Sequence, residues 1–325
     1  MAEILDTVLL LALPASGKSE VRRYLDGLSP EQAREDFHMG PSVQLDDFPY
    51  VHLMRRIDDE LEQRDQPRVF FQSADKPFRD TKDWGTLIEL VNEDHADLMS
   101  RKRVEPDSAA EHVMQRIDAA AEKVGLPRRL AGLDAGLRGE MAAAIEAEAA
   151  DHLAEKQDNY PDTLDGRSLV IEFARGGPQG SPMPLPKEYG YRYSLARLSD
   201  AILSKAVILY IWVTPEESRR KNDARANPDD PGSILHHGVP IDVMLGDYGC
   251  DDMDWLEQQS DKPGTVRVEA HGKVYHLPLA RFDNREDKTT FIREDRADWK
   301  PEQVQALRDE IKRALDELAA RALSD

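Results

Sequence analysis

The segment from Ala12 to Ser19 has the clearest chemical pattern in the sequence, and it reads ALPASGKS. It matches the phosphate-binding loop pattern, with alanine in place of the first glycine. In such a loop, successive backbone N–H groups point inward and bind phosphate oxygens at the positive end of the following helix. We therefore expect the segment to bind ATP through Pro14, Ala15, Ser16, Gly17, Lys18 and Ser19.

The polar positions of this loop have distinct expected roles. Gly17 lets the backbone approach the phosphates closely, Lys18 reaches the outer phosphates, and the Ser19 hydroxyl binds Mg²⁺. Ala12 fits the loop if its φ angle is negative, because only a positive φ favours glycine. The alternative interpretation is an ordinary loop that carries a surface lysine.

The flanking residues predict the elements that such a loop needs. Residues 4–13 form an apolar run that is too short for most helices and ends at Pro14, which is typical of a strand buried on both faces. Apolar residues then recur at helical spacing through residues 18–28. The loop is therefore predicted to join a buried strand to a helix, as phosphate binding requires.

Two adjacent carboxylates, Asp46 and Asp47, follow a second predicted strand at residues 42–45. A carboxylate at a strand end beside a phosphate site can take the proton of a bound hydroxyl or orient that hydroxyl. Placement at the strand end slightly favours Asp46 for this role. The alternative is that the pair complements the N-terminus of the following helix.

A third strand with a charged end is predicted at residues 168–173, where the sequence reads SLVIEF. Glu172 lies near the end of this strand, and Arg175 follows three residues later. Both side chains are candidates for contacts with a metal or with phosphate. The alternative is a surface ion pair at the end of the strand.

A cluster of basic residues follows a further predicted strand at residues 206–213. Four of the seven positions from 219 to 225 are basic, although the chain as a whole has a net charge of −20. Such a local concentration is unusual in an acidic chain. The alternative is a solvated helix face with Glu–Arg pairs three and four residues apart. The basic residues are Arg219, Arg220, Lys221 and Arg225.

These segments resemble those of P-loop kinases of the nucleoside- and metabolite-kinase kind. The opening LLLALPASGKSEVRRYL is similar to the start of such kinases, and VQLDDFPY is similar to the acidic second-strand segment of uridine-kinase-like and phosphoribulokinase-like enzymes. SLVIEF resembles a Walker B strand, with glutamate instead of the commoner aspartate. The resemblance leaves out residues 106–156.

The resemblance implies roles for the remaining candidates. Glu172 is expected to support the Mg²⁺ shell, and Arg175 resembles the arginine that binds an acceptor phosphate in nucleoside monophosphate kinases. The 215–250 region looks like a lid, whose Arg219 and one of Arg220 or Arg225 would close on the transferring phosphoryl group. Asn284 is expected to lie beside the nucleotide base.

The order of these elements predicts an α/β fold of the P-loop NTPase type, with a mainly parallel sheet flanked by helices. Residues 1–105 would form the first part of the core and residues 161–325 the second. Residues 106–160 are rich in alanine and poor in strand-forming residues, so we expect a helical insertion or cap. Residues 69–71 are a further candidate strand.

The C-terminal third supplies further expected elements. The residues around 266–268 and 274–279 are expected to pair as antiparallel strands, and residues 301–323 to form a long helix. Asp251, Asp252 and Asp254 are expected to mark a helix start.

The composition limits the classes of partner. The excess of 63 acidic over 43 basic side chains argues against a nucleic-acid coat or an anionic membrane surface. One cysteine, Cys250, allows no internal disulfide, and we expect a soluble, cytoplasmic protein without a zinc site at His236, His237 and Cys250.

The leading functional hypothesis is an ATP- and Mg²⁺-dependent phosphotransferase that acts on an unidentified small molecule. The second is a P-loop NTPase that acts as a nucleotide-dependent switch or interaction module and has no small acceptor. The third, a kinase that acts on a nucleic-acid end, is disfavoured by the overall charge. The sequence leaves the acceptor and the oligomeric state open.

Overall fold

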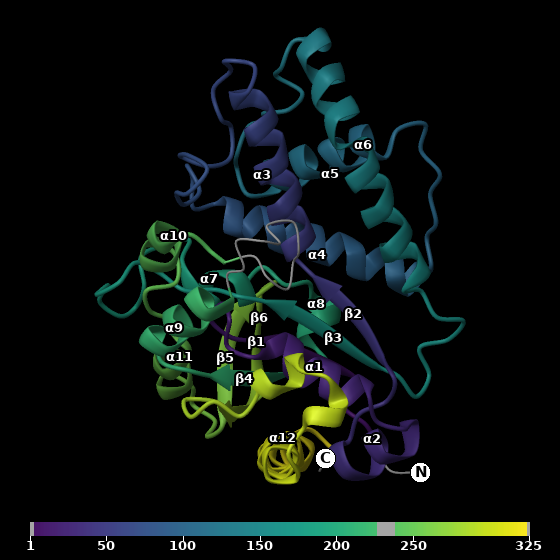
Figure 1. Ribbon diagram of the computed structural model, residues 1–325, viewed down its shortest axis with the longest axis vertical. Coiled ribbons are helices and arrows are strands. Elements are labelled where there is room, and N and C mark those ends of the chain that lie inside the picture. Colours follow the sequence, from purple (N-terminus) through teal and green to yellow (C-terminus); the bar gives the residue numbers. More distant parts are fainter. Residues whose placement is uncertain (1–2, 226–237, 324–325) are drawn as a thin grey trace.

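Six strands form one sheet in the order β2-β3-β1-β4-β6-β5 in the computed structural model, which describes residues 3–225 and 238–323 (Figure 1). The strands β1, β2, β3, β4 and β6 are parallel, and β5 pairs with β6 in an antiparallel hairpin. An α/β fold with a mainly parallel sheet is thus confirmed. The strands are β1 (Thr7–Leu11), β2 (Ser42–Asp46), β3 (Ser168–Phe173), β4 (Ala206–Trp212), β5 (Thr265–Ala270) and β6 (Lys273–Asp283).

Helices follow most of the strands and cover both faces of the sheet. The predicted helix after the phosphate loop is α1, and the predicted C-terminal helix is α12. The helices are α1 (Lys18–Asp26), α2 (Pro30–Phe37), α3 (Phe48–Glu62), α4 (Asp83–Ser100), α5 (Ala109–Lys123), α6 (Ala135–Asp158), α7 (Gly190–Leu195), α8 (Asp200–Leu203), α9 (Pro215–Arg225), α10 (Ile241–Gly246), α11 (Met253–Gln258) and α12 (Pro301–Ala322). Two short 3₁₀ turns, η1 (Thr290–Arg293) and η2 (Arg296–Asp298), precede α12.

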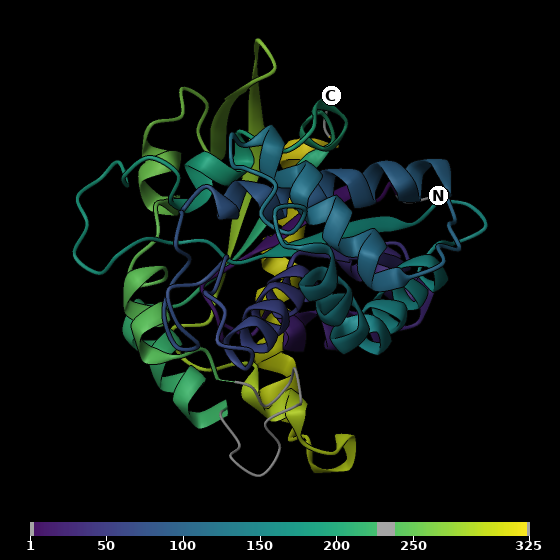
Figure 2. The same ribbon diagram turned by 90° about the horizontal axis from the view of Figure 1, so that it is seen from above.

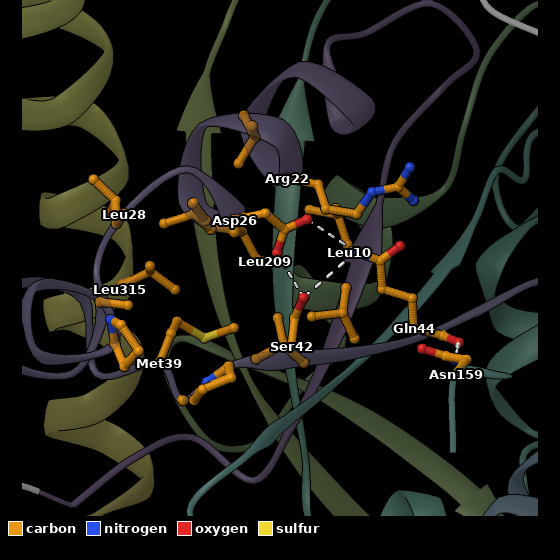
Figure 3. A pocket seen from close by; sticks show the side chains of 18 residues that line it. Leu10, Arg22, Asp26, Leu28, Met39, Ser42, Gln44, Asn159, Leu209 and Leu315 are labelled. Carbon is orange, nitrogen blue, oxygen red and sulfur yellow. Dashed lines mark hydrogen bonds between the residues drawn. The ribbon is translucent and has the colours of Figure 1, made fainter. Parts of the chain in front are cut away.

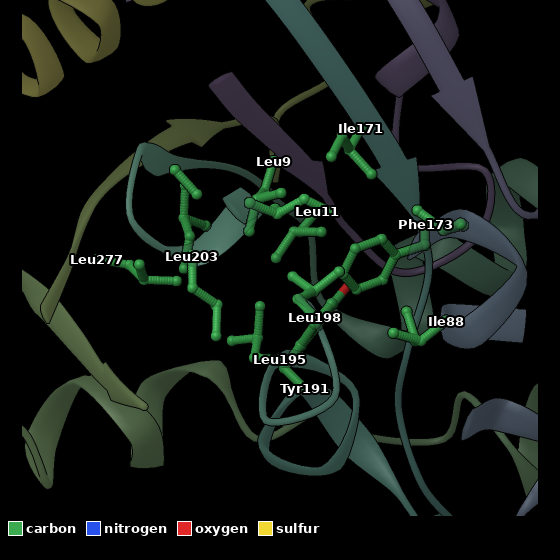
Figure 4. Packing of buried hydrophobic residues seen from close by; sticks show 14 of the residues in the cluster. Leu9, Leu11, Ile88, Ile171, Phe173, Tyr191, Leu195, Leu198, Leu203 and Leu277 are labelled. Carbon is green, nitrogen blue, oxygen red and sulfur yellow. The ribbon is translucent and has the colours of Figure 1, made fainter. Parts of the chain in front are cut away.

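The two faces of the sheet bury separate apolar clusters. Alternate residues of β1 point to opposite faces, so that Leu9 and Leu11 pack with α4, α7, α8 and α11, whereas Val8 and Leu10 pack with α1, α2 and α12. Figure 4 shows Leu9 and Leu11 among the side chains of the first cluster, with Phe173 of β3 and Tyr191 of α7 close by. This double burial explains why β1, β3 and β4 are continuous apolar runs.

A third apolar cluster joins α3, α4, α5 and α6 into a helical unit, which lies between β2 and β3 in the sequence. The residues that we predicted as an insertion, 106–160, include α5 and α6, and these two helices share their core with α3 and α4. Helix α4 also contributes Ile88, Val91 and Leu98 to the sheet cluster, so it anchors the unit to the sheet. Figure 1 shows the unit above the sheet and α12 below it, and Figure 2 looks down on the unit from above.

The strand predicted at residues 69–71 is wrong. Phe71 makes only an isolated antiparallel bridge with Phe78, and the backbone N–H groups of residues 69–71 donate to the buried carboxylate of Asp58 on α3. Distances are 2.7 Å from Val69 N to Asp58 Oδ1 and 2.7 Å from Phe71 N to Asp58 Oδ2. These backbone N–H groups therefore bond to the Asp58 side chain and not to a neighbouring strand.

The predicted hairpin is present, and the three aspartates lie at the start of α11. β5 and β6 confirm the antiparallel pair. Asp251 Oδ1 accepts from Met253 N at the start of α11, whereas the Asp252 carboxylate accepts from Tyr191 N and Arg192 N at the start of α7. In the part of the chain that the structure describes, no helix combines the length and the hydropathy needed to span a membrane.

We predict that Asp58→Asn lowers the free energy of unfolding by about 2 kcal/mol or more, because the amide N–H₂ cannot accept from the backbone donors of residues 69–71. Asp59→Asn is the matched control, since Asp59 is partly exposed and pairs with Arg68. It should cost less than about 1 kcal/mol. Urea denaturation of both variants measures the difference, and equal losses would show that Asp58 does not organise this segment.

Candidate active site

The loop between β1 and α1 has the backbone shape of an anion cradle. Ala15 has a φ of 53° and Gly17 a φ of 102°, and the Ser16 hydroxyl donates to the carbonyl of Leu13 at 2.6 Å. Alternation of right- and left-handed residues turns successive N–H groups to one side. Ala12 keeps a negative φ, as its place in the motif requires. Its carbonyl accepts from the Tyr191 hydroxyl at 2.9 Å, which fixes the start of the loop.

Gly17 is required by space as well as by φ. A Cβ atom at this position would lie 2.5 Å from Thr289 Oγ1 and 2.8 Å from Asn284 Nδ2. Asn284 is fully buried and donates to the Ser16 carbonyl at 2.8 Å. Asn284 therefore lies against the loop and is not one of the described residues that line the adjacent cavity. These contacts give it a role in holding the loop, whereas the sequence analysis expected it beside a base.

A cavity of about 740 Å³ lies between the phosphate loop and the helical unit. The loop supplies one side of it, the ends of β2 and β3 supply a second, and α3 with the segment before α4 supplies a third. The predicted residues that line the cavity are Pro14, Ala15, Ser16, Gly17, Lys18, Ser19, Asp46, Asp47 and Glu172. Residues from both halves of the chain thus meet around one space.

The acidic residues meet because three parallel strands end together. Asp46 of β2 is in register with Glu172 of β3, which is in register with Leu10 of β1, just before the loop. Burial and the neighbouring carboxylates of Glu172 and Asp47 raise the pKa of Asp46 to about 8. Asp46 Oδ1 also accepts from Phe48 N at 2.8 Å, so this residue complements the start of α3 as the alternative interpretation expected.

Arg175 lies behind the cavity wall and is paired with Asp47. Its side chain is 2% exposed, and Nη1 lies 2.7 Å from Asp47 Oδ2. Nε donates to Ser194 Oγ at 2.8 Å, and the guanidinium lies 4.8 Å from the centre of the Trp84 ring. Among the described residues that line the cavity are its neighbours Phe173 and Ala174, but Arg175 is not one of them. The geometry gives Arg175 the task of holding Asp47, not of binding an acceptor phosphate.

Glu172 and Ser19 lie on the cavity, where Mg²⁺ was predicted. Glu172 Oε2 is 2.9 Å from Arg22 Nη1 of α1, so the carboxylate already has one cationic partner. In the described part of the chain, no cluster of three or more His, Cys, Asp or Glu residues could hold a metal by itself. His236 and His237 lie outside the described residues.

The arginine-rich segment forms α9, which packs against the loop through Ser218. The Ser218 hydroxyl donates to the Pro14 carbonyl at 2.7 Å. Arg219 pairs with Glu216 at 3.2 Å, and Arg220 pairs with Glu217 at 2.6 Å. These are the i, i+3 pairs of the alternative interpretation, and neither arginine is among the described residues on the cavity. The side chain of Arg225 lies outside the described residues.

Several residues on the cavity carry no recognisable sequence signal. They are the aromatic residues Phe71, Phe78, Trp84 and Tyr248, together with Arg55 and Asp247. None of them belongs to a motif, and they lie up to 193 positions apart in the sequence, so only the fold brings them together. Arg22 had a weak signal, because it lies four residues after Lys18 on the same helix.

A second cavity of about 470 Å³ lies between α1, α2 and the edge strand β2 (Figure 3). Its lining is mainly apolar, and its main polar contact is the Asp26 carboxylate, which accepts from Ser42 Oγ at 2.6 Å and from Gln44 Nε2 at 3.1 Å. The Asp26 carboxylate is thus already paired within the protein.

The raised pKa of Asp46 predicts a pH-dependent stability. Folding raises the pKa of this carboxyl group from 3.8 to about 8, so the folded state holds the proton more tightly than the unfolded state. The free energy of unfolding therefore falls as the pH rises across this interval. Asp46→Asn should flatten the dependence and stabilise the protein most near pH 8. Urea unfolding of metal-free and nucleotide-free protein across this range measures the effect. Parallel curves for the variant and the wild type would contradict the prediction.

No protein-family model matches the chain, and no curated protein or solved structure matches it. The likeness to P-loop kinases is therefore a likeness of short sequence segments. A function has to be inferred from the residues and the geometry of the cavity.

Proposed function

We propose that the protein is an ATP- and Mg²⁺-dependent phosphotransferase that acts on a small molecule with a hydroxyl group. The observation that carries this proposal is the convergence of the phosphate loop, Asp46 and Glu172 on one cavity of about 740 Å³. This volume lies within the range of small-molecule sites. The loop supplies N–H groups and Lys18, and the opposite side supplies carboxylates.

The strand order supports a fold of the P-loop NTPase type. The connection after β1 leads to β2, which lies on one side of β1 in the sheet. The connection after β3 leads to β4, which lies on the opposite side of β1. Such a reversal leaves a crevice at the carboxyl ends of the two adjacent strands β1 and β3, where ligands bind in open α/β sheets. The phosphate loop leaves β1 at this crevice.

Mg²⁺ would be held by the Ser19 hydroxyl and, through water, by Glu172. The residues fit a cation because Asp46 and Glu172 repel each other at adjacent strand ends, and that repulsion contributes to the raised pKa of Asp46. A hard cation prefers such oxygen ligands and usually keeps several waters. When bound, it would neutralise charge on the phosphates.

The chain's own groups can then divide the work of the transfer. Lys18 and the loop N–H groups bind the outer phosphates. The ionised form of Asp46, which predominates above its pKa of about 8, accepts the proton of the acceptor hydroxyl. The hydroxyl oxygen forms a bond to the γ-phosphorus while the bond from that phosphorus to the bridging oxygen breaks, which leaves ADP. Asp47 is held by Arg175 and orients the acceptor.

We predict that Lys18→Ala lowers ATP-dependent turnover by about a hundredfold or more, because it removes a charge that stabilises the transferring phosphoryl group. The assay is a screen of hydroxyl compounds with ATP and Mg²⁺ in which ADP release is measured. Circular dichroism checks that the variant stays folded.

Lys187→Ala is the matched control, since the Lys187 side chain is 89% exposed and is not among the described cavity residues. It should retain wild-type turnover and ATP affinity. Near-normal turnover in Lys18→Ala would overturn the assignment. ATP binding with slow hydrolysis and no acceptor across the screen would favour the nucleotide-dependent switch instead.

A further inference from the structure

Asp247 is a buried carboxylate on the cavity with an unsatisfied oxygen. The residue is 2% exposed and follows the C-terminus of α10. Its Oδ1 atom is buried and has no hydrogen-bond partner. A buried polar atom without a partner destabilises the fold, so such atoms at a cavity are candidates for ligand contacts.

The position of Asp247 is fixed by the backbone around it. Gly177 and Cys250 exchange hydrogen bonds of 2.8 and 3.2 Å, which ties the segment after β3 to the segment after α10. A Cβ atom on Gly176 would lie 2.8 Å from the Asp247 carbonyl. The carboxylate is thus placed at the cavity by a close backbone contact next to Arg175.

The aromatic residues on the same cavity form a connected series. The Phe71 and Phe78 rings are stacked at 4.4 Å, the Phe78 and Trp84 rings meet edge to face at 4.9 Å, and Trp84 meets Tyr248 at 5.6 Å. Tyr248 follows Asp247 directly in the chain. This part of the cavity therefore combines apolar ring surface with one unsatisfied anionic oxygen, a combination that suits an organic cation.

The described lining of the cavity contains more acidic than basic side chains. Among the described residues that line it, seven are acidic and four are basic. Each of the three arginines contacts another group of the protein. Arg22 pairs with Glu172, and Arg56 pairs with Glu148. Arg55 donates to the Ala74 carbonyl at 2.9 Å. Lys18 belongs to the phosphate loop. The Arg55 guanidinium also lies over the Phe71 ring, 3.9 Å from the ring centre.

We propose that the acceptor is an alcohol that carries an ammonium group, which Asp247 binds while the aromatic residues contact the body of the molecule. This inference rests on the proposed phosphotransferase function, since it names the acceptor class of the same cavity. Burial raises the pKa of Asp247 to about 7, and a bound ammonium would favour the ionised carboxylate.

The test compares three para-substituted benzyl alcohols that differ in charge, of which the ammonium and the neutral compound are isosteric. They are para-(aminomethyl)benzyl alcohol, the neutral para-ethylbenzyl alcohol and the anionic para-(carboxymethyl)benzyl alcohol. Calorimetry with the full chain, with and without ADP and Mg²⁺, measures their dissociation constants. The ammonium compound should bind about tenfold or more tighter than the neutral one, as expected for a charge-assisted hydrogen bond.

Variants identify the residue responsible. Asp247→Asn should reduce the preference for the ammonium compound to about threefold or less, whereas Asp247→Glu should retain part of it. Asp162→Asn is the matched control, because Asp162 is exposed and is not among the described cavity residues, and it should leave the preference unchanged. A preference that persists in Asp247→Asn would overturn the role of Asp247.

Equal or tighter binding of the neutral or anionic compound to the wild type would overturn the proposal without any variant. Failure of the ammonium compound to bind would also overturn it. ATP affinity, measured on the same protein, decides the proposed phosphotransferase function separately. Loss of ATP binding together with a retained ammonium preference would reject the function but keep an ammonium site at Asp247.

Discussion

The arrangement of the cavity depends on one constraint, which is that parallel strands end at the same edge of the sheet. Asp46, Glu172 and the start of the phosphate loop lie side by side because β2, β3 and β1 run in register. This proximity creates repulsion between carboxylates in a partly buried place. The same repulsion makes the edge suitable for a cation and for polyphosphate contacts.

Arginines that form ion pairs with these carboxylates relieve part of the repulsion. Arg22 pairs with Glu172, and Arg175 pairs with Asp47 while it packs between the Phe173 and Trp84 rings. Each of these two guanidinium groups is therefore committed to one of the protein's own carboxylates. In a chain with a net charge of −20, basic residues near the phosphate loop are thus partly used to hold acids in place.

Local patterns predicted much of the fold and the loop side of the site. The loop from Ala12 to Ser19, the α/β sheet and the C-terminal helix follow from apolar runs, helical spacing and turn residues, which act over a few neighbouring positions. The strand predicted at residues 69–71 failed because Asp58 supplies the partners of its backbone donors. That contact joins two separate segments, and no pattern within residues 69–71 reveals it.

The sequence by itself determined where the segment with a phosphate-binding loop pattern lies and which carboxylates end the strands, because both depend on residue type and on short-range geometry. The tertiary structure decided which charges are already paired. It buried Arg175 against Asp47, set Asn284 behind Gly17, and left Asp247 with an unsatisfied oxygen beside four aromatic rings. Pairing and burial depend on which distant segments meet, and that is fixed only when the sheet and the helical unit pack together.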